Sequence, residues 1–108
     1  MGDVIGRMRR RLTVMAPVEA DDGAGGVVRT YEDARTVWAA VEPVAGGFRL
    51  AAGRTGQTVT HRIILRSGQA LTAQHCLRDG TRTYRVRSVH AADAEGRFLV
   101  ALTEEMTG

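Results

Sequence analysis

The feature that most constrains the fold is the pair Asp79-Gly80, which lies between two segments that alternate in the manner of β-strands. These flanking strands are predicted over His75 to Arg78 and Thr81 to His90. Glycine tolerates the positive φ that a tight hairpin turn demands, so Asp-Gly in this position is a strong hairpin signal. The C-terminal part of the chain is therefore expected to consist of antiparallel strands.

Apolar alternation predicts four more strands. In the first, Leu12 and Val14 alternate with polar neighbours, as in a half-buried strand, and Pro17 is expected to end it. In the second, Thr36 to Glu42, both faces of the strand are expected to be covered by other parts of the protein, including the face that carries Trp38. The predicted ranges are Met8 to Ala16, Thr36 to Glu42, Thr58 to Arg66 and Arg97 to Thr103.

Two long connections separate these strands. Residues 18–35 include the run Asp21-Asp22-Gly23-Ala24-Gly25-Gly26, which predicts a flexible polar loop. Residues 44–57 form the second loop, and the small and apolar residues from Val44 to Thr55 favour one or two turns of helix. The prediction for the single domain 1–108 is an all-β fold: a small antiparallel β-barrel of about six strands with two long loops and one short helix.

Composition narrows the function classes. All fifteen basic residues are Arg, and against twelve carboxylates they give a net charge of +3, which is small for a dedicated nucleic-acid binder. The single cysteine, Cys76, excludes an internal disulfide framework and is expected to be a small buried hydrophobe. We expect no membrane span and no signal peptide, and folding in a reducing cytoplasm.

The motifs of enzymes and metal sites do not fit this sequence. The glycine cluster lacks the lysine that a phosphate-binding loop places after its last glycine. His75 and Cys76 are neighbours, and neighbours on a strand point to opposite faces, which disfavours a shared metal. No nucleophile elbow surrounds Ser67, Ser88 or Cys76. We predict a non-enzyme with no catalytic residues, no metal and no cofactor.

Two groups of arginines are candidates for contacts with other molecules. Arg9 and Arg11 would share one face of the first strand, within a basic patch that also contains Arg7 and Arg10. Arg85 and Arg87 would share one face of a later strand, where they could meet an acidic patch on a neighbouring subunit. The more ordinary alternative is that these side chains are solvated or paired with carboxylates of the same chain.

The order and spacing of several motifs resemble the siphophage head-tail joining family, the stopper or head-completion proteins. The most specific motif is Val37-Trp38-Ala39-Ala40-Val41-Glu42-Pro43. The others are Ile5-Gly6-Arg7-Met8-Arg9-Arg10-Arg11-Leu12-Thr13-Val14, Asp22-Gly23-Ala24-Gly25-Gly26, the small-residue stretch Gly46 to Gly53, Thr60-His61-Arg62-Ile63-Ile64-Leu65-Arg66, Asp79-Gly80 with Tyr84-Arg85-Val86-Arg87-Ser88-Val89, and Glu104-Glu105.

This resemblance implies a small β-barrel that assembles as a homo-oligomeric ring, a hexamer in such families, in the neck of a tailed phage or a phage-like gene transfer particle. Assembly would take place in the cytoplasm of the bacterial host. The implied partners are an adaptor or portal ring on the head side, a tail-terminator or tail tube protein on the other, and packaged double-stranded DNA in the channel. The loop 44–57 would project towards the channel and help retain DNA, with Arg49 and Arg54 as DNA-facing candidates.

Two alternatives remain open at this point. A tail-terminator ring is also small and oligomeric, but its fold mixes helices with a sheet and would need a long helical segment. A free-standing nucleic-acid-binding barrel would bind tightly as an isolated monomer and in a salt-sensitive way. A connector, by contrast, is expected to have little affinity for DNA before assembly.

Overall fold

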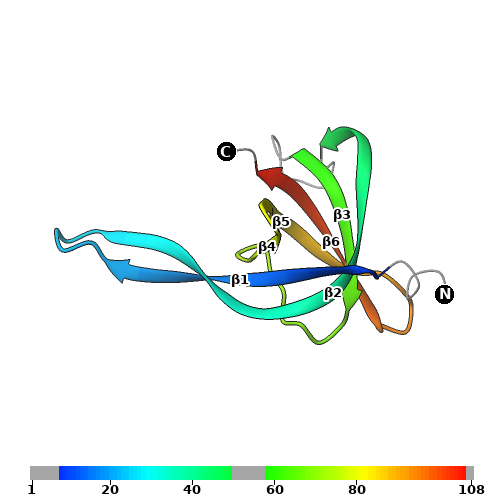
Figure 1. The fold of residues 1–108 in the computed structure, drawn as a ribbon, viewed down its shortest axis with the longest axis horizontal. Helices are drawn as coiled ribbons and strands as arrows, with labels where there is room; N and C mark the ends of the chain where they lie inside the picture. The colour runs from blue at the N-terminus through cyan, green and yellow to red at the C-terminus, as the bar shows by residue number, and fades with distance from the viewer. Residues whose placement is uncertain (1–7, 50–57, 107–108) are drawn as a thin grey trace.

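The computed structural model describes residues 8–49 and 58–106, which form six antiparallel strands and no helix (Figure 1). The strands are β1 (Arg10–Asp21), β2 (Val27–Arg49), β3 (Thr58–Arg66), β4 (Cys76–Asp79), β5 (Arg82–Ala91) and β6 (Phe98–Met106). They pair in the order β1-β2-β3-β6-β5-β4, and β4 pairs back with β1, so the sheet closes into a barrel. The all-β class and the six antiparallel strands are confirmed.

Alternating side chains fill the inside of the barrel. Leu12 and Val14 of β1 are fully buried, as are Ile63 and Leu65 of β3 and Tyr84 of β5. Residues at every second position of a strand point to one face, which explains why these pairs reach the same core. The core is therefore built mostly from aliphatic residues, as a sequence poor in aromatics requires.

The predicted hairpin at Asp79-Gly80 is confirmed, with its turn one residue later than expected. Asp79 still pairs with Arg82, so the two connecting residues are Gly80 and Thr81. Gly80 has a φ of +61°, whereas Thr81 is not among the residues with positive φ. Glycine at the first central position is the arrangement of a tight hairpin whose twist matches that of its strands.

The later strands lie close to their predicted ranges. The prediction for Thr58–Arg66 has the observed bounds of β3. Strands β4, β5 and β6 are displaced or extended by a few residues relative to their predicted ranges.

The helix predicted between Val44 and Thr55 is wrong as far as the structure describes this range. Strand β2 continues to Arg49, and Phe48 pairs with Val59 of β3. A register shift lies between Pro43 and Phe48, where the sequence has Gly46 and Gly47. A single helical turn is costly to nucleate, whereas the edge of β3 offers hydrogen-bond partners to this segment. Residues 50–57, the rest of the predicted loop, lie outside the described residues.

The flexible loop predicted over residues 18–35 is also wrong. Strand β1 runs to Asp21 and β2 starts at Val27, so most of this range forms a long two-stranded arm that projects from the barrel (Figure 1). Pro17 does not end β1 but pairs with Tyr31. Proline is tolerated on the edge of a sheet, and beyond Met15 the partner of β1 in the described structure is β2 alone.

Candidate functional site

The arm is an amphipathic ribbon with no second layer. In β1, Ala16, Val18 and Ala20 occupy alternate positions, and Val28 lies opposite Ala20 on β2. Val27 and Val28 are 65% and 46% exposed, respectively. A two-stranded ribbon cannot cover its own apolar side chains, and an isolated hairpin of this kind is marginally stable in water. These residues are therefore available for contact with another molecule.

The tip of the arm is a defined turn with two ordered carboxylates. The carboxylate of Asp22 accepts hydrogen bonds from the backbone N–H groups of Ala24 and Gly26, at 2.8 and 2.9 Å. The carboxylate of Asp21 accepts one from Gly23 at 2.9 Å. These backbone donors lower the pKa of Asp22 below its ordinary value, with Ala24 the main contributor. The tip therefore stays negatively charged over the physiological range.

A second surface lies on the outside of the barrel around Trp38. The Trp38 side chain is 56% exposed, so the expectation that both faces of this segment are covered is wrong. Trp38 lines a shallow pocket of about 500 Å³ together with Met8, Arg9 and Arg66. The guanidinium of Arg66 lies 5.7 Å from the centre of the Phe98 ring, a cation–π contact that leaves its charge at the surface. We call this surface the Trp38 pocket.

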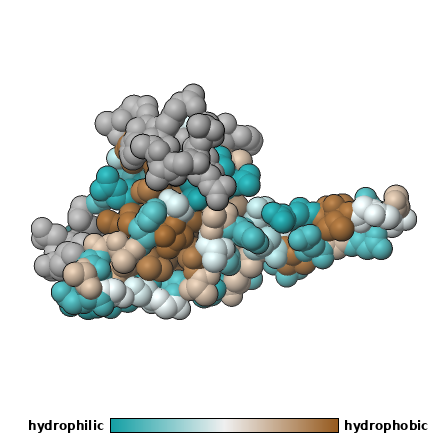
Figure 2. Space-filling view, turned by 180° about the vertical axis from the view of Figure 1, so that it is seen from behind, coloured by the Kyte–Doolittle hydropathy of each residue, from teal (hydrophilic) through white to brown (hydrophobic). Residues whose placement is uncertain are grey.

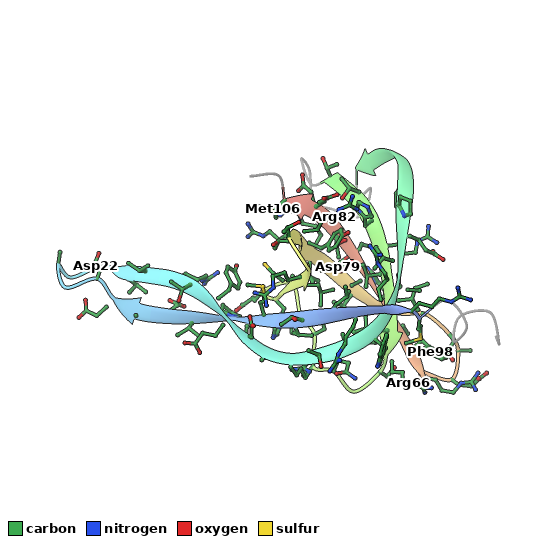
Figure 3. The ribbon with its side chains drawn as sticks, in the orientation of Figure 1. Asp22, Arg66, Asp79, Arg82, Phe98 and Met106 are labelled. Carbon is green, nitrogen blue, oxygen red and sulfur yellow. The ribbon has the colours of Figure 1, made fainter. Side chains whose placement is uncertain are left out.

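Apolar residues extend beside this pocket. Ala40, Ile64 and Phe98 form a small buried cluster separate from the main core, with Met8 and Val100 packed against it. Figure 2 shows apolar side chains gathered on one side of the barrel and again towards the end of the arm. Figure 3 places Asp22 at the tip of the arm, with Arg66 and Phe98 together at the other end of the molecule. The arm tip and the Trp38 pocket are thus widely separated in one chain.

The structure brings one of the predicted arginines, Arg9, to this pocket. Arg11 does not line the pocket but lies directly opposite Trp38 in the pairing of β1 with β2, so these two side chains share one face of the sheet. Arg10 lies opposite the buried Ala39 instead, and its guanidinium forms an ion pair with Asp79 at 2.9 Å. The predicted basic patch is therefore divided between two faces of β1.

The other predicted arginines lie elsewhere. Arg85 is exposed on β5, opposite Glu104 of β6, and Arg87 forms an ion pair with that same Glu104. A register shift between Val86 and Ser88 places Arg87 in a β-bulge. Arg49 is the last residue of β2, and its side chain lies outside what the structure describes, as does the whole of Arg54. These arginines do not gather into one site in the described structure.

Many arginines are paired within the chain. Ion pairs join Arg29 to Glu19, Arg62 to Glu42, Arg78 to Asp33, Arg82 to Glu105 and Arg97 to Asp93. A carboxylate beside a guanidinium competes with phosphate for the same donors. The described surface is therefore not a continuous basic groove.

In the ranges that the structure describes, no group of three or more His, Cys, Asp or Glu side chains is placed to hold a metal ion. Within these ranges no helix is long and apolar enough to cross a membrane. Cys76 is buried, as predicted, and burial raises the pKa of its thiol.

The arm and the pocket at Trp38 were both missed from the sequence. The alternation Ala16, Val18, Ala20 was available as a signal for the arm, but alanines and a proline weakened it. The exposure of Trp38 carries no local signal, because alternation shows which residues share a face and not which face is covered.

Comparison with known proteins places the chain in a family. A model of the phage head completion protein family matches residues 4–106. A chain of the virion of a native gene transfer agent particle is 27% identical, with a TM-score of 0.72 over 94% of this chain and 98% of that one. A protein of Shigella flexneri 2a, solved in solution, is also 27% identical, with a TM-score of 0.71 over 94% and 95% of the two chains. No curated protein matches. Because the family model spans nearly the whole sequence, the chain belongs to the phage head completion protein family.

Proposed function

We propose that the protein is a stopper or head-tail connector that forms a ring in the neck of a tailed phage or gene transfer particle. Membership of the head completion family and similarity to a virion chain support a structural role in joining head and tail. The same family membership favours a non-enzymatic protein. The ring would lie between the portal-adaptor complex and the tail.

The observation that carries this proposal is the arm. An extended ribbon with exposed valines has no role in closing the barrel, because the six strands already close it. Large exposed apolar groups on a projecting element are typical of a surface that a partner covers. An assembly subunit needs such a surface, whereas a free-standing barrel does not.

Retention of DNA is the finer part of the proposal. The segment 44–57, which spans the end of β2 and its connection to β3, would face the channel, with Arg49 and Arg54 contacting phosphates weakly. A channel must let DNA pass, so a few distributed contacts suit it better than a dense basic groove, whose grip would be strong at low salt. The internal pairing of many arginines fits this weak affinity.

The first test is the mass of the chain in solution, measured by light scattering alone and with the purified head-side connector. A ring or a stable co-complex is the expected result. A monomer that does not bind the connector would contradict the proposal. If that monomer also binds duplex DNA tightly, the protein is instead a free-standing nucleic-acid-binding barrel.

A second test addresses the loop. Deletion of residues 46–56 should give particles that assemble but lose packaged DNA, and the double change Arg49→Ala and Arg54→Ala should do so more weakly. Particles are counted by electron microscopy, and retained DNA is measured after nuclease treatment. Retention equal to that of the unaltered particle would refute the channel role of this loop.

A further inference from the structure

Charge is distributed unevenly between the arm and the rest of the chain. Residues 18–35 contain five carboxylates and two arginines, which gives this segment a net charge of −3. Since the whole chain carries +3, the remainder carries +6. An acidic projection on a basic body is electrostatically complementary to a second copy of itself.

The apolar groups show the same complementarity. The end of the arm presents Val27 on the face that it shares with Asp21, its partner on β1, and the carboxylate of Asp22 follows at the turn. Val28 lies on the opposite face, across from Ala20. The Trp38 pocket presents an exposed indole, flanked by the guanidinium groups of Arg9 and Arg66. Each surface is therefore an apolar centre with a charged rim, and the two rims have opposite signs. Such a combination is typical of protein–protein interfaces.

One chain cannot make this contact with itself. Val27 and Trp38 lie on the same strand, eleven positions apart, which corresponds to roughly 36 Å at the rise of a β-strand. The two surfaces lie towards opposite ends of the molecule, whose longest dimension is 52 Å (Figure 3). A contact between different surfaces of identical subunits is heterologous, and when its rotation closes it generates a ring.

We propose that the tip of the arm, centred on Val27, docks into the Trp38 pocket of the next copy of this chain. Val27 covers the indole of Trp38, and Asp21 and Asp22 lie beside Arg9 and Arg66 of that neighbouring copy. This inference rests on the proposed ring and adds the surfaces that hold it together. Val27, the most exposed valine of the arm, then becomes buried when assembly occurs.

Cross-linking tests the contact directly. The variant Ala24→Cys with Thr36→Cys places one thiol in the turn at the tip and one at the rim of the pocket, both on exposed residues. These positions are too far apart for an intramolecular disulfide, which needs Cα atoms within about 7 Å. Oxidation, alone and with the head-side connector, should give a ladder of dimers, trimers and larger species on a non-reducing gel.

Matched controls keep this result interpretable. Ala24→Cys with Ala94→Cys keeps the tip thiol but moves the other to the exposed turn between β5 and β6. Each single variant can give dimers at most, and the native Cys76 is buried. If the Ala24/Ala94 variant gives the same ladder as the Ala24/Thr36 variant, or if neither gives one, the inference is overturned.

Mixing two defective variants gives an independent test. Val27→Glu with Val28→Glu damages the arm, and Trp38→Glu damages the pocket; all three side chains are exposed, and circular dichroism checks that both variants fold. Each variant alone should be monomeric at concentrations where the unaltered chain forms rings. Together they should form a dimer, because one intact arm can meet one intact pocket. Rings from either variant alone, or a mixture that stays monomeric, would overturn the inference.

These outcomes separate the inference from the proposed function. A chain that forms rings with the head-side connector but gives no Ala24–Thr36 ladder retains the connector role and loses this interface. A chain that forms neither ring nor co-complex loses both.

Discussion

At the scale of single residues, the turn between β4 and β5 depends on Gly80. Its φ is +61°, and a Cβ added there would meet no atom within 4 Å, so any cost of substitution comes from backbone strain and not from a clash. Gly80→Ala should lower the free energy of unfolding by about 1–2 kcal/mol. Gly80→Asn should cost less, because asparagine tolerates this region better than alanine. Urea denaturation of the two variants gives both values, and equal losses would contradict this explanation.

The thiol of Cys76 provides a prediction about pH. Burial raises its pKa above the ordinary value of 9.0, against opposing effects of a hydrogen bond with Tyr31 and the charge of Arg85. Above pH 9.0 the unfolded chain loses the thiol proton while the folded chain keeps it, so stability should fall as pH rises towards the folded pKa. The slope is at most about 1.4 kcal/mol per pH unit.

The matched comparison for this prediction is Cys76→Ala, which removes the titrating group. The difference in unfolding free energy between the two proteins should be constant below pH 8 and shrink above pH 9, as measured by urea denaturation. A difference that stays constant up to pH 10 would show that the thiol titrates alike in both states.

At the scale of elements, the arm should be far less protected than the barrel in the isolated chain. Its backbone hydrogen bonds are shared between two strands and open to water on both sides, while β1 near Leu12 is held in the closed sheet. Amide hydrogen exchange should therefore be fast for residues 16–32 and slow around Leu12 to Val14. Assembly should slow exchange in the arm. Equal protection of arm and barrel in the monomer would contradict this expectation.

Strand β3 and the arm show what the sequence could and could not predict. The range Thr58 to Arg66 was predicted with its observed bounds, because it is rich in β-branched and aliphatic residues and Ser67-Gly68 follows. The arm was predicted as a loop because glycines, aspartates and Pro17 dominate its sequence. Those residues mark a turn of five residues and an edge strand, and local composition alone cannot set the extent of either.

The candidate site was predictable in part for a similar reason. Strand alternation placed Arg9 and Arg11 on one face; in the structure Arg9 lines the Trp38 pocket and Arg11 lies opposite Trp38 in the sheet. Alternation did not show that Trp38 and Arg66 lie beside Arg9. Their proximity depends on the pairing of β1 with β2 and on which face of β2 remains uncovered. Contacts between segments distant in the sequence are decided by the closed sheet and not by local pattern.

At the scale of the whole molecule, the uneven charge predicts how association depends on salt. Attraction between an acidic arm and a basic body is screened as ionic strength rises, with a Debye length of about 10 Å at 0.1 M salt. Self-association should therefore weaken between 0.05 and 0.5 M NaCl (roughly 14 and 4 Å of screening length). Analytical ultracentrifugation measures this effect. Asp21→Asn with Asp22→Asn should reduce the salt dependence, while Glu95→Gln, a change at the β5–β6 turn, should leave it unaltered.

The short seam where β4 meets β1 also has a consequence for folding. Three residue pairs, from Thr13–Arg78 to Met15–Cys76, close the barrel there, and their members lie far apart along the chain. The β1–β2 and β4–β5 hairpins can form from neighbouring segments, but this seam must wait until nearly the whole chain is in place. Folding should accordingly be slow for a chain of this length, on a timescale of about milliseconds to seconds, as is usual when distant pairings dominate. Until the seam closes, the interior of the barrel is open to the surrounding water.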